Sequence, residues 1–595
     1  MSLKTVRIGC ASAFYGDSQL SARQLVDKGN IDYLVFDYLA EATMAILSRA
    51  KAKNEALGYA VDFVTVAMRD VLADCANNNI RVVANAGGVN VPACINALRT
   101  LVDELGLDLK VAGVYGDDLS ALIQDQDAVD LPSMDKANPL PEKLASINAY
   151  LGARPIADAL AAGADIVVTG RVVDSAVVIA PLMHEFDWQE DQYDQLAQGA
   201  LAGHIIECGA QCTGGNFTDW HLVPDFSNMS YPIVEVSENG NFVVSIPPET
   251  GGLVSRASVG EQVLYEIGDP ANYLLPDVAC NFSQVQLEQV GENQVKVSGA
   301  TGRAPGNQYK VCATYIDGYR LMGTFYMGGL RVADKARASL EAWVRRTQNA
   351  FAEKGWDDYR EVSIEIVGAE DTYGPHGEAN KTREAMGKYG LHHNSREALS
   401  FAAAEMAYLA TSGPPGMSGF GAGRARPQPL MRIHSALINK EQVPVKVQLG
   451  DELIAEKTYP TIEESASTAK YHMRIEPLDE QSDWLSVPLE TIAYARSGDK
   501  GNDANVGIMA RKSEYMPVLN QQVTAQAVED YFFHLLEGYV ERFYVPGFDA
   551  FNFLMTEALG GGGTASIRID SQGKAFGQML LSMPVKVPPE WVGNS

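Results

Sequence analysis

Strand and helix signals alternate along the first third of the chain, and this alternation limits the fold more than any other feature. The strand signals are short apolar runs: TVRIGCA, IDYLVFDY, RVVANAGG and LKVAGVYGDD. Continuous apolar runs of this kind are typical of strands that are covered on both faces. The segments between them have apolar residues at helical spacing, as in VPACINALRTLVDELG. Repeated strand–helix units predict an α/β fold with a mainly parallel sheet flanked by helices.

From about Asp219 onward this pattern gives way to another. Runs such as FVVSI and NQVKVSG, separated by glycine and proline, indicate antiparallel strands, which we interpret as a β-rich insertion. Residues 451–486 are polar and acidic, so they are predicted to be a linker. The remainder, from Val487 to about residue 590, has its own pattern of strands and a helix. The chain is therefore expected to fold as a large α/β domain followed by a small α+β domain.

The charge of the chain limits its partners. The net charge is −28, which repels phosphate backbones and anionic membranes, so neither nucleic acid nor a membrane is expected as a partner. An anionic small molecule is compatible with this charge only where arginine or lysine side chains gather locally. The seven cysteines are scattered, and the first residues lack the apolar run of a signal peptide. These features predict a cytoplasmic protein with reduced thiols.

Two polar motifs follow strand signals, at the ends where ligands collect in parallel sheets. The first contains Asn85, Gly87 and Gly88, and its glycines would let backbone N–H groups approach an anion at a helix start. A tight turn between strand and helix is the alternative. The second, TGRVVDS, contains Arg171, which suits a carboxylate or phosphate, and Asp174, which suits a general base. Its alternative is that Asp174 pairs with Arg171 and caps the next helix.

A third motif, HIIECGAQC, combines an acid with thiols. We interpret Glu207 as an acid/base group or substrate contact, and Cys208 as a substrate contact or nucleophile, with a buried thiol as the alternative. His204, Cys208 and Cys212 would share one face of a helix. Zinc sites usually use other spacings, and the nearby glycines favour an end to the helix, so no metal site is expected.

Two glycine-rich stretches carry local positive charge. ARSGDKGNDANVG contains Arg496, Asp499, Lys500 and Asn502, and its glycine and asparagine residues could form an anion-binding nest of backbone N–H groups. These four residues are therefore predicted to bind substrate, with a solvated loop as the alternative. SGPPGMSGFGAGRARP contains Arg424 and is interpreted as a flexible basic lid over an anionic group. It follows a helix signal and not a strand, which excludes a dinucleotide-binding fingerprint.

Four motifs, in this order, resemble the acyclic terpene utilisation family AtuA: TGRVVDS, GHIIECGAQCTGGNF, VSGATGR and ARSGDKGNDANVG. The resemblance covers nearly the whole chain. It implies an AtuA core domain at residues 1–450 and an AtuA-like ferredoxin-fold domain at residues 487–590, joined by the linker. Cys212 departs from the family pattern, where a small aliphatic residue is common, and this weakens a metal site further.

The resemblance also implies a function. The family belongs to bacterial gene clusters that degrade citronellol and geraniol through acyl-CoA intermediates. We therefore expect an enzyme that acts on a branched acyl-CoA, or on the acid derived from it, by lyase or hydratase chemistry. Asp174 or Glu207 is then the expected base, while Arg171 and the amides of Gly87 and Gly88 hold the anion. The alternative is a non-catalytic acyl-CoA-binding or scaffold protein of the same pathway.

Coenzyme A is expected only as part of the substrate, with no separate cofactor. Arg424, Arg426, Arg496 and Lys500 are the residues expected to meet its phosphates. Because a small ferredoxin-like domain with an exposed sheet often packs against another subunit, a homo-oligomer with contacts from the C-terminal domain is also expected.

Overall fold

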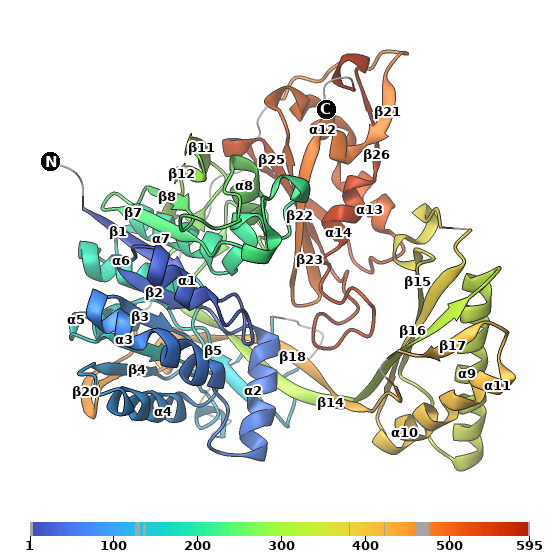
Figure 1. Ribbon diagram of the computed structural model, residues 1–595, viewed down its shortest axis with the longest axis horizontal. Coiled ribbons are helices and arrows are strands. Elements are labelled where there is room, and N and C mark those ends of the chain that lie inside the picture. The colour runs from blue at the N-terminus through green and yellow to red at the C-terminus, as the bar shows by residue number, and fades with distance from the viewer. Residues whose placement is uncertain are drawn as a thin grey trace.

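Figure 1 shows the computed structural model, which describes residues 4–124, 131–134, 139–379, 381–421, 423–459 and 475–592. A large α/β region forms one side of the molecule, a second lobe that contains α9 and α10 forms the other, and the C-terminal domain sits above both. None of the helices in these residue ranges has the length and apolar composition needed to cross a membrane.

The main sheet has eleven strands with a parallel centre. Its parallel strands, in spatial order, are β1 (Thr5–Cys10), β2 (Tyr33–Phe36), β3 (Arg81–Ala84), β6 (Ile166–Thr169) and β4 (Val111–Tyr115). All four residues of β2 and of β6 are buried, as expected for strands covered on both faces. The predicted strand–helix units are therefore present.

Antiparallel strands extend this sheet at both edges. Beside β1 lie β7 (Ile233–Ser237), β8 (Phe242–Ser245), β12 (Gln294–Ser298) and β11 (Gln286–Gly291); beside β4 lie β19 (Val445–Leu449) and β20 (Glu452–Lys457). The prediction of a mainly parallel sheet was wrong, because the chain returns to the same sheet through these strands and makes it mixed. Strand β20 uses the first residues that the sequence interpretation gave to the linker, whose residues 460–474 lie outside the described ranges. The domain boundaries stay a prediction.

Two layers of helices cover the main sheet. Leu34 and Phe36 of β2 pack in one apolar core with α1 (Ser21–Lys28), α2 (Glu41–Lys53), α3 (Arg69–Asn78) and α4 (Val91–Glu104). Tyr33 and Val35 point to the other face, where they join the core of α5 (Arg154–Ala161), α6 (Ala176–Phe186), α7 (Tyr193–Ile206) and α8 (Arg256–Leu264). The alternation of side chains along a strand thus feeds two separate cores.

A long strand connects the α/β region to the second lobe. Strand β14 (Gln308–Gly328) pairs with β5 (Ser146–Ala149) near its start and with β16 (Glu384–His393) near its end (Figure 1). Its sheet also contains β15 (Glu361–Val367), β17 (Met417–Phe420) and β18 (Gln428–Asn439). Helices α9 (Val332–Lys354) and α10 (Arg396–Glu405) cover one face of the lobe around the buried Trp343, and the short α11 (Leu409–Ser412) follows. A separate small sheet consists of β13 (Thr301–Arg303), β10 (Ala279–Asn281) and β9 (Tyr273–Leu274).

The C-terminal domain has an antiparallel sheet and its own apolar core. The strands of this sheet, in order, are β22 (Ala493–Lys500), β23 (Asp503–Ala510), β25 (Ala550–Met555) and β24 (Val540–Val545). The helices of the domain are α12 (Met516–Gln522), α13 (Ala525–Phe532) and α14 (Phe576–Leu581). A separate pair of strands consists of β21 (Leu485–Pro488) and β26 (Pro584–Val587). The stretch ARSGDKGNDANVG is the hairpin of β22 and β23, with Gly501 at a φ of 66° in its turn. The stretch forms a paired ladder, whereas the sequence was interpreted as an anion-binding nest, with a solvated loop as the alternative.

Glycines allow this hairpin to lie directly on α8. A Cβ atom added at Gly507 would lie 2.4 Å from Cβ of Leu264, and one added at Gly498 would lie 2.6 Å from Cγ of Glu266. Since real Cβ atoms do not approach other atoms so closely, both positions require glycine for the observed contact.

We expect Gly507→Ala to lower the free energy of unfolding by about 1–3 kcal/mol, because the methyl group overpacks the contact with Leu264. Chemical denaturation of the full chain measures this. Gly268→Ala is the matched control, since nothing lies within 4 Å of a Cβ at that position. If both variants lose the same free energy of unfolding, the close contact with Leu264 is not the cause of the loss.

Candidate functional site

The carboxyl ends of the parallel strands bring polar side chains to one edge of the main sheet. Asp37 follows β2, Asn85 follows β3, Asp117 lies after β4, and Arg171 and Asp174 lie after β6. Four of these residues are buried, whereas the Asp174 side chain is 38% exposed. This is the edge at which α/β sheets bind ligands, and solvent reaches it at Asp174.

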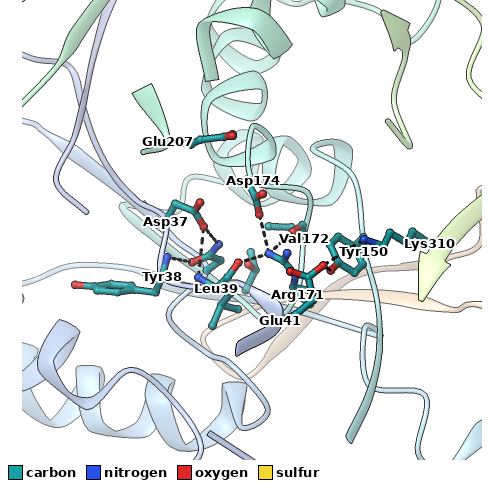
Figure 2. Close-up of polar contacts among 12 residues, drawn as sticks. Asp37, Tyr38, Leu39, Glu41, Tyr150, Arg171, Val172, Asp174, Glu207 and Lys310 are labelled. Atoms are coloured by element: carbon teal, nitrogen blue, oxygen red, sulfur yellow. Dashed lines mark hydrogen bonds and ion pairs between the residues drawn. The ribbon is translucent and has the colours of Figure 1, made fainter. Parts of the chain in front are cut away.

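The Arg171 side chain fixes the centre of this edge (Figure 2). Its Nη1 donates to Oδ1 of Asp174 at 2.7 Å and to the backbone carbonyls of Leu39 and Val172. Its guanidinium carbon lies 4.1 Å from the centroid of the Tyr150 ring, a cation–π contact. These contacts use Arg171 to position Asp174. The pair in the alternative interpretation of TGRVVDS is present, but α6 has Ser175 at its N-cap position and no side-chain cap hydrogen bond.

Asn85 joins the ends of two neighbouring strands. Its Nδ2 donates to Oδ1 of Asp37, and its Oδ1 accepts the N–H of Tyr38 at 2.7 Å. The hydroxyl of Ser12, from the loop after β1, donates to the carbonyl of Asp37 at 3.0 Å. Asn85 is fully buried, so its contribution is to hold the loop that carries Asp37.

Three carboxyl groups, those of Asp37, Asp174 and Glu207, influence one another at this edge. Glu207 caps the C-terminus of α7 and is buried, with Oε1 3.3 Å from Nδ1 of His204. Burial and the nearby charge of Asp174 raise the pKa of Glu207 well above its ordinary value, and burial, Asp174 and Glu207 likewise raise the pKa of Asp37. Burial also lowers the pKa of His204 to about 4, so its imidazole is neutral at pH 7. The surroundings of Glu207 therefore favour its protonated form.

Another carboxylate near Arg171 behaves in the opposite way. Glu41, the first residue of α2, accepts hydrogen bonds from the Tyr150 hydroxyl at 2.5 Å and from Nζ of Lys310 at 3.2 Å (Figure 2). Burial alone would raise the pKa of Glu41, but Lys310, Arg171 and the Tyr150 hydrogen bond together hold it below its ordinary value. One region thus contains a glutamate whose pKa is lowered and another whose pKa is raised, an arrangement that suits acid/base chemistry.

The C-terminal domain adds charged side chains to the same region. Nζ of Lys500 donates to the backbone carbonyl of Glu266 at 2.9 Å, and Nζ of Lys574 donates to Asp499 at 2.8 Å and to the Glu266 carboxylate at 3.2 Å. The positive charge of Lys500 acts on the pKa of Glu207, so hairpin and sheet edge are electrostatic neighbours. Arg496 is buried; it donates to Gln211 and, at 3.0 Å, to the carbonyl of Asn216.

The predicted glycine amides are occupied by the protein itself. The N–H of Gly87 donates to the Thr169 carbonyl at 2.9 Å, and that of Gly88 to the Asn85 carbonyl at 3.5 Å. These bonds make a tight turn before α4, which is the alternative interpretation. Asn502 also has an internal partner, since its Oδ1 accepts the N–H of Gly561 at 2.6 Å.

Arg424 lies far from this edge. It is exposed in the loop after β17, and Phe420 of that strand pairs with Phe325 of β14. At roughly 3.3 Å per residue, Phe325 is on the order of 50 Å along β14 from Lys310. The structure does not bring Arg424 to the other predicted site residues.

Cys208 lies beside Glu207 but is a poor nucleophile. Burial and the charges of Glu207 and Glu266 raise the pKa of its thiol well above the ordinary value, and the reactive form of cysteine is the thiolate. Within the described residues, no three His, Cys, Asp or Glu side chains are arranged to hold a metal ion.

Comparison with known families decides the identity of the chain. A model described as acyclic terpene utilisation family protein AtuA matches residues 6–449, and a model described as AtuA ferredoxin-like domain matches residues 487–586. The chain belongs to the AtuA family. No curated protein and no solved structure matches it. The resemblance seen in the sequence is confirmed, and AtuA membership links the chain to the utilisation of acyclic terpenes.

The AtuA site contains residues that sequence reasoning missed: Asp37, Glu41, Tyr150, Glu266, Lys310 and Lys574. Asp37 had a readable signal, since it directly follows the buried run YLVF. Lys310 had none, because nothing in the sequence pairs the start of β14 with β5. The others depend on contacts between distant segments.

A buried acid at the boundary with the C-terminal domain makes stability depend on pH. Glu261 of α8 accepts the N–H of Thr218 at 3.1 and 3.3 Å, and burial raises its pKa to about 8. A raised pKa means that the native state favours the protonated acid. Below about pH 4.5 the acid is protonated in both the native and the unfolded state, and the native state has its full stability. As the pH rises towards 8 the unfolded state loses this proton first, so the free energy of unfolding falls.

We expect Glu261→Gln to remove this dependence. The variant should have the higher free energy of unfolding, and its advantage over the unmodified chain should grow by about 1.4 kcal/mol for each pH unit between pH 5 and 8. Denaturant titrations across that range measure the difference. Glu288→Gln, at a side chain that is 68% exposed, is the control. Parallel curves for Glu261→Gln and the parent would contradict the expectation.

Proposed function

We propose that this AtuA protein is an enzyme of acyclic terpene breakdown that moves a proton next to the carbonyl of a branched acyl-CoA or of the acid derived from it. The observation that carries the proposal is Glu207, a buried carboxyl whose pKa is raised well above its ordinary value. It lies close enough to the partly exposed Asp174 for their charges to interact. Two carboxyl groups in one site can act as general acid and general base.

Asp174 is the base in this proposal. Arg171 holds its carboxylate at 2.7 Å, and the side chain is open to solvent and therefore to a ligand. The C–H bond next to the substrate carbonyl breaks, its proton passes to Asp174, and the electron pair forms an enolate. Glu207 gives its proton to the carbonyl oxygen of the enolate, which becomes an enol, and the reverse transfers return a proton exchanged with solvent to the carbon. Lyase and hydratase reactions both use such proton transfers.

The test is exchange of the substrate hydrogen with solvent. The full chain is incubated in D2O with citronellyl-CoA and, separately, with citronellic acid, whose carbon next to the carbonyl is saturated. The masses of the recovered compounds and of any products are measured by mass spectrometry. Deuterium gained next to the carbonyl, or a new product, is the expected result. Binding of either compound without exchange or product would favour the non-catalytic acyl-CoA-binding or scaffold protein.

A cytoplasmic location and assembly into a homo-oligomer belong to the same proposal. The support for both is the composition of the chain and its ferredoxin-like domain. Molar mass in solution, measured by light scattering, tests the assembly.

A further inference from the structure

Lys500 differs from the other lysines of the site in its partners. Lys310 pairs with Glu41 at 3.2 Å, and Lys574 pairs with Asp499 at 2.8 Å and with Glu266 at 3.2 Å. Among the residues that the structure describes, Lys500 has no carboxylate within ion-pair distance. Its Nζ donates instead to the neutral carbonyl of Glu266 and lies 5.4 Å from the centroid of the Tyr273 ring.

The ammonium group of Lys500 is available to a ligand. The residue is exposed, and an ammonium has three donors, of which the Glu266 carbonyl takes one. Arg496, the other cation of the hairpin without a carboxylate partner, is buried and directs its donors at Gln211 and Asn216. Of the two cations in this stretch of the hairpin, Lys500 is therefore the one that is free to contact a ligand.

A second ammonium lies in electrostatic range of the first. Part of Lys500 is exposed, but partial desolvation and then repulsion by Lys310, from β14 of the core, lower its pKa. The carboxylates of Glu266, Glu41 and Asp174 act on the same group in the opposite direction. Two like charges supplied by two different domains face one region, and an anion placed there would relieve their repulsion.

We propose that Lys500 and Lys310 together bind an oxyanion of the substrate, so that the C-terminal domain completes the site formed by the core. This rests on the proposed function, because it places the charged end of the same substrate beside Asp174. One ammonium without an ionic partner matches a single negative charge. That favours the carboxylate of a branched acid over the multiply charged phosphates of coenzyme A.

Binding measurements on the full chain test the assignment. Isothermal titration with geranic acid and with coenzyme A is made on the unmodified chain, Lys500→Gln, Lys310→Gln and Lys500→Arg. We expect Lys500→Gln and Lys310→Gln each to weaken geranic acid binding about tenfold or more, and Lys500→Arg to retain it. Lys512→Gln is the matched control, since Lys512 lies on the same domain with a side chain 57% exposed. Circular dichroism checks that each variant is folded.

The outcomes separate the sources of the oxyanion. If Lys500→Gln loses binding of coenzyme A but keeps binding of geranic acid, the assignment of the lysines to a carboxylate is wrong and they bind phosphate instead. Unchanged binding of both ligands, or no binding of either by the unmodified chain, would overturn the proposal as a whole. Because these titrations need no turnover, they also distinguish it from the proposed function. Exchange that persists in Lys500→Gln with unchanged affinity defeats only the lysine assignment, and binding without exchange defeats only the acid/base assignment.

Discussion

Glu207→Gln should lower the rate of solvent exchange at the substrate carbon by about 10²–10⁴-fold, the usual contribution of a positioned proton donor. The amide has nearly the size of the protonated carboxyl but cannot give up a proton to the substrate. Burial and Asp174 raise the pKa of Glu207, so the native state favours the neutral form that the amide resembles. As for Glu261, the substitution should raise the free energy of unfolding at neutral pH and not lower it, so a lost rate would not come from unfolding. Exchange of citronellyl-CoA or citronellic acid in D2O measures the rate.

The pH dependence gives the same test a second readout. In the unmodified chain, the protonated fraction of Glu207 falls as the pH rises through its raised pKa, so a reaction that uses it as an acid should slow on the alkaline side. The residual rate of Glu207→Gln should not show this decrease at alkaline pH. Glu288→Gln, on edge strand β11, is the control and should keep both rate and profile. A Glu207→Gln protein with an unchanged rate would remove Glu207 from the mechanism.

Arg171→Met is expected to lower the free energy of unfolding by about 3–5 kcal/mol, because it breaks a buried charge network by removing one partner. Arg171 is 2% exposed and donates to Asp174 and to the carbonyls of Leu39 and Val172. Methionine fills part of the volume of the arginine side chain but has no hydrogen-bond donor. The buried carbonyls of Leu39 and Val172 would then each lose the hydrogen bond from Arg171. Urea denaturation of the full chain measures the loss.

Arg154→Met provides the comparison for Arg171→Met. Arg154 pairs with Asp158 at 2.9 Å, but its side chain is 33% exposed, so the expected loss is about 1 kcal/mol or less. If both substitutions cost the same, the burial of Arg171 is not what makes it important. The expected ratio also separates a scaffold role for Arg171 from direct contact with substrate.

The sequence predicted those parts of the site that follow a local rule. Arg171 and Asp174 come directly after the apolar run DIVV, and Asn85 comes directly after RVVA, so their positions at strand ends were readable. Asp37 obeys the same rule, but the run IDYLVFDY was interpreted as a strand through Tyr38, and this concealed it. The ladder of β2 ends at Phe36, which leaves Asp37 as the first residue of the loop.

Contacts between distant segments could not be predicted in this way. Nothing local states that β7 pairs antiparallel with β1, which is the pairing that makes the sheet mixed. The local positive charge of ARSGDKGNDANVG was noted, but its glycine and asparagine residues were interpreted as a nest or loop. In the structure they belong to two paired strands and the turn between them. Which of its cations faces the core depends on the docking of the hairpin on α8, and that is set by Gly498 and Gly507.

The parts of this molecule are joined in two different ways, with consequences for dividing it into fragments. Strand β14 carries hydrogen-bond ladders to β5 and to β16, so a break within it would cut through both the α/β region and the second lobe. Those two parts must be produced as one polypeptide. In the described residues, the C-terminal domain shares no strand with the rest and has its own core. Its Met509, Val545, Phe548 and Ala550 are nevertheless buried in the core of the α/β region, so a cut between the two parts would expose apolar surface on both. The two parts are thus separable in hydrogen bonding but not in packing.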